Sequence, residues 1–166
     1  MTDEIPELFR RLSLGVYIIG VASGDRRRAF TAAWVMQVSF EPLLLALSIN
    51  PSSACYPLLR EGGGFTVNVL HRDQLEVARR FGTGTGRSDD RLAEVNWRPG
   101  RNGSPILTEA LAYFDCELAG TLPAGDHQLA LGRVVDGRVM APGAMPLLYT
   151  DTGTLDGSAA LYPTRL

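Results

Sequence analysis

The sequence has little of what several functional classes require. Its 166 residues include only two cysteines, Cys55 and Cys116, and two histidines, His71 and His127. The cysteines are far apart and form no Cys-x-x-Cys pair, so we expect buried thiols, although one disulfide is formally possible. No cluster of cysteine and histidine at metal-ligand spacing is present, and the sequence therefore predicts no metal site. A Gly-x-Ser-x-Gly elbow is also missing, which leaves an α/β-hydrolase triad unsupported.

Charge and long apolar runs are equally scarce. The formal net charge is −2, so bulk attraction to nucleic acid or to an anionic membrane is not expected. The basic run Arg26–Arg28 is interpreted as a solvated hairpin tip. No apolar stretch approaches the length of a membrane span, and residues 1–14 carry charges that do not fit a secretory signal. We therefore expect a cytoplasmic protein with no membrane and no nucleic-acid partner.

Short apolar stretches separated by turn residues predict many strands and few helices. The length fits a single domain over residues 1–166. Glu41-Pro42 ends one apolar stretch, because proline cannot donate to a strand ladder. Helices are expected at 5–12, 54–60 and 73–81, with a helical turn at 89–94, and strands at 14–22, 31–40, 43–49, 65–70, 111–120, 129–139 and 147–150.

This order contains no regular βαβ alternation. It therefore predicts a mostly β (α+β) fold, in which antiparallel strands form a barrel with short peripheral helices. The link 122–125 carries turn residues between the two long strands. The tail 151–166 ends in apolar residues that need cover, so we expect it to lie over a neighbouring surface.

Small and hydroxylic residues lie at both ends of the buried unit 30–53. Asn50-Pro51-Ser52-Ser53 opens an expected helix, whose free N–H groups can bind an anion, although a plain N-cap explains the same residues. The small side chains of 31–33 would let backbone amides approach a flat ring, or would simply pack in a barrel strand. Ser48 and Asn50 end a buried strand, where they either meet a ligand or satisfy local backbone groups.

An ordered set of short motifs in this chain resembles the flavin reductase-like, FMN-binding split-barrel family. Each motif is weak alone, but their order along residues 15–149 is fairly specific. The motifs are Ala-Phe-Thr-Ala-Ala-Trp at 29–34, Gln-Val-Ser-Phe-Glu-Pro at 37–42, Leu-Ser-Ile-Asn at 47–50, Phe-Thr-Val-Asn-Val-Leu at 65–70, Ala-Arg-Arg-Phe-Gly at 78–82 and Gly-Asp-His at 125–127. The resemblance implies an antiparallel FMN-binding split β-barrel and a homodimer with FMN at its interface.

The resemblance also implies a set of site residues. The FMN phosphate is expected at Ser52 and Ser53, with Ser53 the better single candidate, and Ser48 and Asn50 are expected near the ribityl chain or the pyrimidine edge. His127 is expected beside the flavin and the nicotinamide. The isoalloxazine edge is expected along Thr31, Ala32, Ala33 and Trp34, and the border of the phosphate and ribityl chain at Arg80, Phe81 and Gly82.

Several of these residues have ordinary alternatives. Trp34 is as readily a core or dimer contact as a flavin contact, and Phe81 as readily a core residue. Arg80 is as readily a solvated side chain. The run Gly82–Gly86 invites a dinucleotide-binding interpretation, but it closes a helix instead of opening one, so we interpret it as a loop that could border the site as a lid.

The implied function is an NAD(P)H:FMN oxidoreductase of the flavin reductase type. FMN would be the cofactor, NADH or NADPH the hydride donor, and an unidentified redox partner could accept the electrons. Two alternatives stay open: an FMN-binding electron-transfer flavoprotein with little NAD(P)H activity, and a non-catalytic split-barrel module that binds a ligand. The ending Tyr149–Gly157 does not match the aromatic ending of monooxygenase-partner reductases, so a dedicated monooxygenase partner is not implied.

Overall fold

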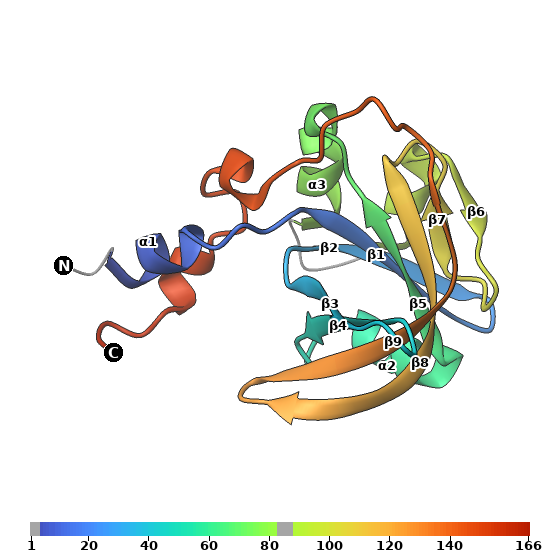
Figure 1. Cartoon of the computed structure of the whole chain (residues 1–166), viewed down its shortest axis with the longest axis horizontal. Helices are drawn as coiled ribbons and strands as arrows, with labels where there is room; N and C mark the ends of the chain where they lie inside the picture. Colours follow the sequence, from blue (N-terminus) through green and yellow to red (C-terminus); the bar gives the residue numbers. More distant parts are fainter. Residues whose placement is uncertain (1–3, 83–87) are drawn as a thin grey trace.

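The chain forms one strongly curved antiparallel sheet in the computed structural model, which describes residues 4–82 and 88–166 (Figure 1). Across this seven-stranded sheet of the described chain the order is β2-β1-β5-β8-β9-β4-β3. Its strands are β1 (Tyr17–Ser23), β2 (Arg26–Ala32), β3 (Val35–Ser39), β4 (Leu44–Ile49), β5 (Gly64–Val69), β8 (Ala112–Ala124) and β9 (His127–Val139). A separate ribbon consists of β6 (Trp97–Pro99) and β7 (Pro105–Leu107). The prediction of a mostly β, antiparallel architecture with short peripheral helices is confirmed.

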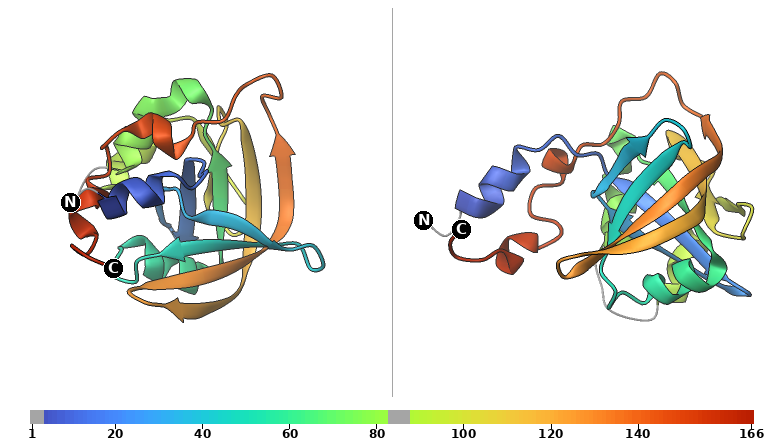
Figure 2. Two further views of the ribbon diagram at one scale, coloured as in Figure 1. Left: turned by 60° about the vertical axis from the view of Figure 1, so that its left-hand side comes forward. Right: turned by 60° about the horizontal axis from the view of Figure 1, so that its bottom comes forward.

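The two edges of the sheet come together because the chain passes directly from one to the other. The outermost strands in the sheet order, β2 and β3, are consecutive in sequence, and Ala33 and Trp34 link them. The sheet therefore curls into a barrel around its core, as the two further views show (Figure 2). This corner of the barrel becomes the centre of the candidate site.

Seven short helices accompany the sheet in the described parts of the chain. They are α1 (Glu4–Arg10), α2 (Cys55–Gly62), α3 (Leu75–Gly82) and the 3₁₀ helices η1 (Arg72–Gln74), η2 (Ser88–Glu94), η3 (Tyr149–Thr152) and η4 (Ser158–Leu161). Helices thus appear in each of the four places predicted from the sequence. Gly63 ends α2 with φ of +67°, a left-handed conformation that glycine adopts without strain. No helix in these parts of the chain is long and apolar enough to cross a membrane.

Two apolar clusters fill the molecule. The first lies inside the barrel and joins Leu47 and Phe65 to Leu59 of α2. The second lies between the outer face of the sheet and α3, where Ile18 packs with Phe81. Burial of this apolar surface is the main favourable term in folding. It also fixes α2 and α3 against β1 and β2 through different clusters.

Both cysteines are buried and free, as predicted. Cys55 begins α2, and Cys116 lies on β8. Burial raises the pKa of the Cys116 thiol to about 12, and the neighbouring Asp115 adds to this shift. Cys116 is therefore a packing residue that stays protonated at neutral pH.

The predicted strand 31–40 is wrong as a single element. Thr31 pairs with Ile18 of β1, whereas Val35 pairs with Leu47 of β4. The partner strands β1 and β4 lie next to opposite ends of the sheet order, so the chain must leave one strand and begin another between Thr31 and Val35. The β-branched and aromatic residues of 31–40 do form strands, but composition does not reveal that the chain changes its partner strand within this stretch.

The predicted strand 147–150 is also wrong. Leu148 makes one isolated bridge with Gly15, and the side chain of Asp151 then accepts a hydrogen bond from the Leu148 N–H at 3.2 Å. This contact turns the chain into η3.

The turn between the two long strands is shorter than the predicted link 122–125. Strand β8 continues to Ala124, and only Gly125 and Asp126 separate it from β9.

The end of the C-terminal segment lies beside α1 in all three views, and Figure 1 shows both projecting from the barrel (Figures 1 and 2). The rings of Phe9 and Tyr162 are 5.3 Å apart, and Arg10 donates to the Gly153 carbonyl. The tail therefore contacts another surface of the chain, as predicted. Its apolar end is not covered within the chain, because Leu161 is 84% exposed.

Candidate functional site

A pocket of about 240 Å³ opens at the corner where β2 leads into β3. The strand pairing explains why polar residues meet there. Ile49 at the end of β4 pairs with Gln128 at the beginning of β9, and the Ser48 N–H donates to the Trp34 carbonyl at 3.0 Å. The end of β4 and the starts of β3 and β9 therefore converge on the same corner.

Eight of the twelve predicted site residues line this pocket. They are Thr31, Ala32, Ala33, Trp34, Ser48, Asn50, Ser53 and His127. Gly82 lines an adjoining hollow of about 100 Å³, which shares Thr31, Ala32 and Ala33 with the pocket. Residues from four separate parts of the sequence are thus brought to one place.

The other three predicted residues line neither hollow. Arg80 directs its Nε atom to Glu94 Oε2 at 2.9 Å, and Phe81 is buried in the second apolar cluster. For Ser52, the backbone N–H is satisfied by the Asn50 side chain at 2.9 Å. These contacts favour the core alternative for Phe81, and they place Arg80 in an ion pair, which neither the phosphate border nor the solvated side chain had anticipated.

The segment from Asn50 to Tyr56 forms a tight polar turn at one end of the pocket. The Asn50 carbonyl accepts the Ser53 N–H at 3.0 Å, and the Ser53 carbonyl accepts the Tyr56 N–H at 3.1 Å. Ser53 Oγ accepts the N–H of Cys55 at 3.2 Å. A hydroxyl that accepts one hydrogen bond can still donate its own proton. Ser53, at the start of α2, can therefore donate to an anion in a place that the helix dipole also favours.

The corner residues present small side chains and backbone to the pocket. Thr31 Oγ1 donates to the Ala78 carbonyl at 2.7 Å, so its hydroxyl fixes β2 to α3 and is not directed at a ligand. Ala32 and Ala33 follow with side chains too small to block a close approach. A flat ring could therefore lie against the backbone here, which was the reason for expecting one.

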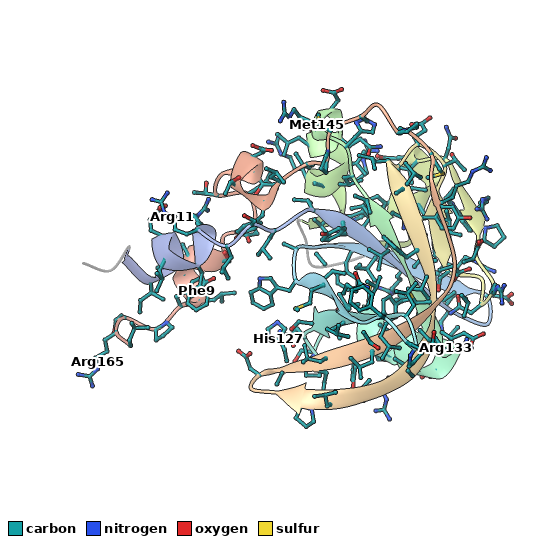
Figure 3. All side chains as sticks on the ribbon, viewed as in Figure 1. Phe9, Arg11, His127, Arg133, Met145 and Arg165 are labelled. Atoms are coloured by element: carbon teal, nitrogen blue, oxygen red, sulfur yellow. The ribbon has the colours of Figure 1, made fainter. Side chains whose placement is uncertain are left out.

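Trp34 and His127 both line the pocket, and Figure 3 shows where His127 lies on the ribbon. Their ring centroids are 5.1 Å apart with an interplanar angle of 55°. His127 Nδ1 lies 2.7 Å from Asp126 Oδ1, and this hydrogen bond, together with the charge of His127, lowers the pKa of the Asp126 carboxyl. Since Nδ1 is engaged by Asp126, Nε2 is the ring nitrogen left for a ligand.

Three residues of the C-terminal tail line the same pocket and were missed. They are Tyr149, Asp156 and Ser158. The sequence indicated that the tail covers a neighbouring surface, but its glycine-rich pattern carries no periodicity that would identify that surface. Their only visible signal was a tyrosine followed by closely spaced aspartate and serine, which is common in ordinary turns.

Other parts of the chain add less to the site. The possible lid at 83–86 lies outside the described residues. Arg26–Arg28 lie on β2 and line a separate hollow of about 780 Å³, so the interpretation as a solvated tip was incomplete. Arg26 pairs with Glu61 at 2.6 Å, and Arg27 lies over the Trp97 ring. Within residues 4–82 and 88–166, no group of three or more His, Cys, Asp or Glu side chains could hold a metal ion.

Comparison with known proteins identifies the type of domain. The family model described as "Flavin reductase like domain" matches residues 9–157. Among solved structures, the Streptomyces globisporus C-1027 NADH:FAD oxidoreductase SgcE6 superposes with a TM-score of 0.81 at 25% identity, covering 89% of this chain and 88% of that one.

Two curated relatives show how this domain occurs elsewhere. A putative diflavin flavoprotein A 2 of Synechocystis is 42% identical over 142 residues, which cover 83% of this chain but 25% of the relative. A probable flavin reductase of Rhizobium meliloti is 33% identical over 129 residues, covering 77% of this chain and 40% of the relative. The chain thus spans about a quarter of the length of the diflavin relatives.

Proposed function

This chain belongs to the family of flavin reductase-like domains, and on that premise we propose that it binds FMN in the corner pocket and receives hydride from NADH or NADPH. Membership of the family, with flavin reductases among its relatives, supports an oxidoreductase. The observation that carries the finer proposal is the convergence of Ser53, the small corner residues and His127 on one pocket.

The donor groups of the pocket fit the two ends of a flavin nucleotide. The Ser53 hydroxyl, at the start of α2, can donate to a phosphate in a place that the helix dipole also favours. Ala32 and Ala33 leave the backbone open to a ring, and Ser48 and Asn50 provide polar groups between these two ends. When bound, FMN would supply the redox chemistry by taking a hydride with its electron pair from the dihydronicotinamide. The protein would bind, orient and provide charge.

The visible absorption spectrum is the first test of this proposal. We expect flavin bands after the protein is mixed with FMN and freed of excess ligand, and bleaching of these bands when NADH or NADPH is added without oxygen. FAD should be tried in parallel, because SgcE6 is an NADH:FAD oxidoreductase. If the protein neither retains nor uses either flavin, the proposal is contradicted. The favoured function would then be that of a non-catalytic module that binds another ligand.

We further propose that the domain works as a homodimer. The edge strand β3 carries a row of exposed apolar side chains, of which Phe40, just beyond its end, is 86% exposed and Met36 is 63% exposed. An unpaired edge strand with apolar side chains is a favourable surface for association. Trp34 begins this row and also lines the pocket. Association at this face would therefore place the flavin beside the second protomer.

Substitution of the β3 face should disrupt the dimer. Phe40→Asp is expected to raise the dimer dissociation constant by at least about tenfold, because a charge would replace a large apolar contact. Sedimentation velocity over a range of concentrations measures this change. Met145→Asp is the matched control, since Met145 is 60% exposed on the loop before η3 (Figure 3). An equal effect of the two substitutions, or none from Phe40→Asp, would place the interface elsewhere.

Electron transfer is the second candidate function, and the relatives favour it. The chain matches about a quarter of each diflavin flavoprotein, and it matches 61% of a high molecular weight rubredoxin of Moorella thermoacetica. In such proteins the domain stands beside other parts of the same chain, which could be its redox partners. Steady-state oxidation of NADH and NADPH with excess FMN separates the candidates, because an electron carrier would oxidise these donors slowly or not at all.

The predicted cytoplasmic location stays a prediction.

A further inference from the structure

The C-terminal tail supplies a wall of the pocket that is not part of the barrel. Tyr149, Asp156 and Ser158 line the pocket together with residues of the barrel corner. Tyr149 and Asp156 also line the adjoining hollow, together with Thr152 and Leu155 of the same segment. We call residues 149–158 the tail wall. A ligand that lies against Thr31–Ala33 would therefore also contact the tail wall.

The tail wall is held in shape by polar contacts around Tyr149. The Tyr149 hydroxyl donates to Asp156 Oδ2 at 2.6 Å and lies 3.1 Å from Ser158 Oγ. Asp156 Oδ1 accepts the Ser158 N–H at 3.0 Å. The Tyr149 N–H donates to the Leu14 carbonyl at 2.8 Å, which joins the wall to the segment before β1. Tyr149 is therefore the point at which the two ends of the wall are tied together.

Arg10 of α1 covers this cluster from the side. Its guanidinium lies 5.8 Å from the centre of the Tyr149 ring and donates to the Gly153 carbonyl within the wall. A guanidinium above a tyrosine ring is attracted by the ring quadrupole. The arginine thus fixes the orientation of the ring, whose remaining surface borders both hollows.

The protonation states of Tyr149 and Asp156 favour the hydrogen bond between them. Burial raises the pKa of the Tyr149 hydroxyl, and its hydrogen bond to Asp156 raises it further. Burial opposes ionisation of Asp156, but hydrogen bonds from Tyr149 and Ser158 outweigh it, so the pKa of this carboxyl is lowered overall. At neutral pH a protonated phenol therefore donates to a carboxylate, which is the stronger kind of hydrogen bond.

The wall as a whole buries little apolar surface. Neither η3 nor η4 contains a buried residue, whereas α3 on the other side of the corner buries Ala78 and Phe81. Segments held mainly by exposed polar contacts open at a low free-energy cost. Among the described residues, Tyr149 is the wall's one attachment to the second apolar cluster, so the rest of the wall can move away from the pocket, and the contacts of Tyr149 set how often it does.

We propose that Tyr149 is a further flavin-binding residue and that the tail wall it ties together controls how fast the flavin leaves the pocket. This inference rests on the proposed function, because it takes the flavin to be the ligand of the corner pocket. The half-buried ring of Tyr149 offers apolar and aromatic surface to a flat ring system, while its hydroxyl is committed to Asp156. Retention of the flavin is thus a property of the tail as well as of the barrel.

The test compares flavin release from four conservative variants. Tyr149→Phe removes the hydrogen bond that ties the wall, whereas Asp156→Asn keeps an acceptor for the Tyr149 hydroxyl and removes only the charge that strengthens the bond. Tyr113→Phe and Asp136→Asn are matched controls. The Tyr113 hydroxyl donates to Asp136 at 3.0 Å, and the Arg98 guanidinium lies 4.9 Å from the centre of the Tyr113 ring. Neither Tyr113 nor Asp136 lines either hollow. Release of FMN is followed by the recovery of flavin fluorescence after rapid dilution.

Loss of one hydrogen bond to a charged group is worth on the order of a tenfold change in rate. We therefore expect release about tenfold faster for Tyr149→Phe, a smaller increase for Asp156→Asn, a larger increase for Tyr149→Ala, and a change of less than about twofold for the controls. Limited proteolysis should show that FMN protects the tail of the wild type and protects it less in Tyr149→Phe. Thermal unfolding of each variant establishes that the barrel is intact.

The outcomes separate this inference from the function it rests on. If the wild type binds FMN and all the variants release it at the wild-type rate, the role of Tyr149 is refuted while flavin binding stands. If the wild type retains no flavin, the proposed function fails and the inference fails with it. If the Tyr113 and Asp136 controls release FMN as fast as the tail variants, the effect is one of general stability and the assignment of Tyr149 is overturned.

Discussion

Replacement of Ser53 by aspartate is expected to lower the FMN affinity by at least about 100-fold. Ser53 lies in the corner pocket at the start of α2, where its hydroxyl accepts the Cys55 N–H. An aspartate there would keep an acceptor for that N–H, so the turn should persist. It would also bring a negative charge to the place proposed for the phosphate.

The size of the effect follows from the charges involved. Two unit charges about 4 Å apart near a protein surface interact with about 4 kcal/mol, and a phosphate dianion doubles that figure. Solvent and salt reduce it, but the remainder still exceeds the ~2.7 kcal/mol that corresponds to a 100-fold change in affinity. The affinity is measured by quenching of FMN fluorescence during titration with protein.

Ser53→Asn is the matched control for this substitution. Asparagine has nearly the shape of aspartate and can cap the same N–H, but it carries no charge. Its FMN affinity should fall by less than about tenfold. If Ser53→Asp binds FMN as the wild type does, the phosphate lies elsewhere, whereas an equal loss in both variants would indicate a steric effect.

The parts of the site that could be predicted from sequence are those formed by local chain geometry. The turn at Asn50–Ser53 follows from proline and hydroxylic residues after a buried strand, and the structure places it at the pocket. His127 comes directly after the tight turn Gly125-Asp126, so its position at the start of a strand was also readable. In these segments neighbours in sequence decide the conformation.

The parts that could not be predicted depend on partners distant in sequence. Nothing local distinguishes Thr31, which pairs with β1, from Val35, which pairs with β4. Arg80 carries no mark of the ion pair that turns it toward Glu94. Tyr149 lies more than a hundred residues from Thr31, and only the folded chain brings both to one hollow. Strand pairing and tail placement are decided by tertiary contacts, which local propensity does not contain.

Replacement of His127 by alanine is expected to slow NAD(P)H oxidation by about 100-fold with FMN present. His127 lines the pocket, and its Nδ1 atom is held 2.7 Å from Asp126 Oδ1. A ring fixed through one nitrogen presents the other in a constant direction. His127 can therefore orient the nicotinamide or stabilise charge on the reduced flavin, and alanine can do neither.

Two measurements distinguish this role from a structural one. FMN affinity, followed by fluorescence quenching, should change by less than about threefold in His127→Ala, because the proposed phosphate and ring contacts lie on other residues. The rate of anaerobic flavin reduction in a single turnover should carry the loss. His71→Ala is the control, since His71 follows β5 and makes an isolated bridge with Pro146, outside the pocket.

Asp126→Asn provides the graded version of the same experiment. An asparagine oxygen still accepts from Nδ1, but the carboxylate charge beside the imidazole is lost, so a rate loss smaller than that of His127→Ala is expected. If His127→Ala oxidises NADH and NADPH at the wild-type rate, the histidine has no part in the reaction. In that case its contact with Trp34, at 5.1 Å between ring centres, would be its principal role, and hydride transfer would depend on how the backbone at Ala32 and Ala33 holds the flavin.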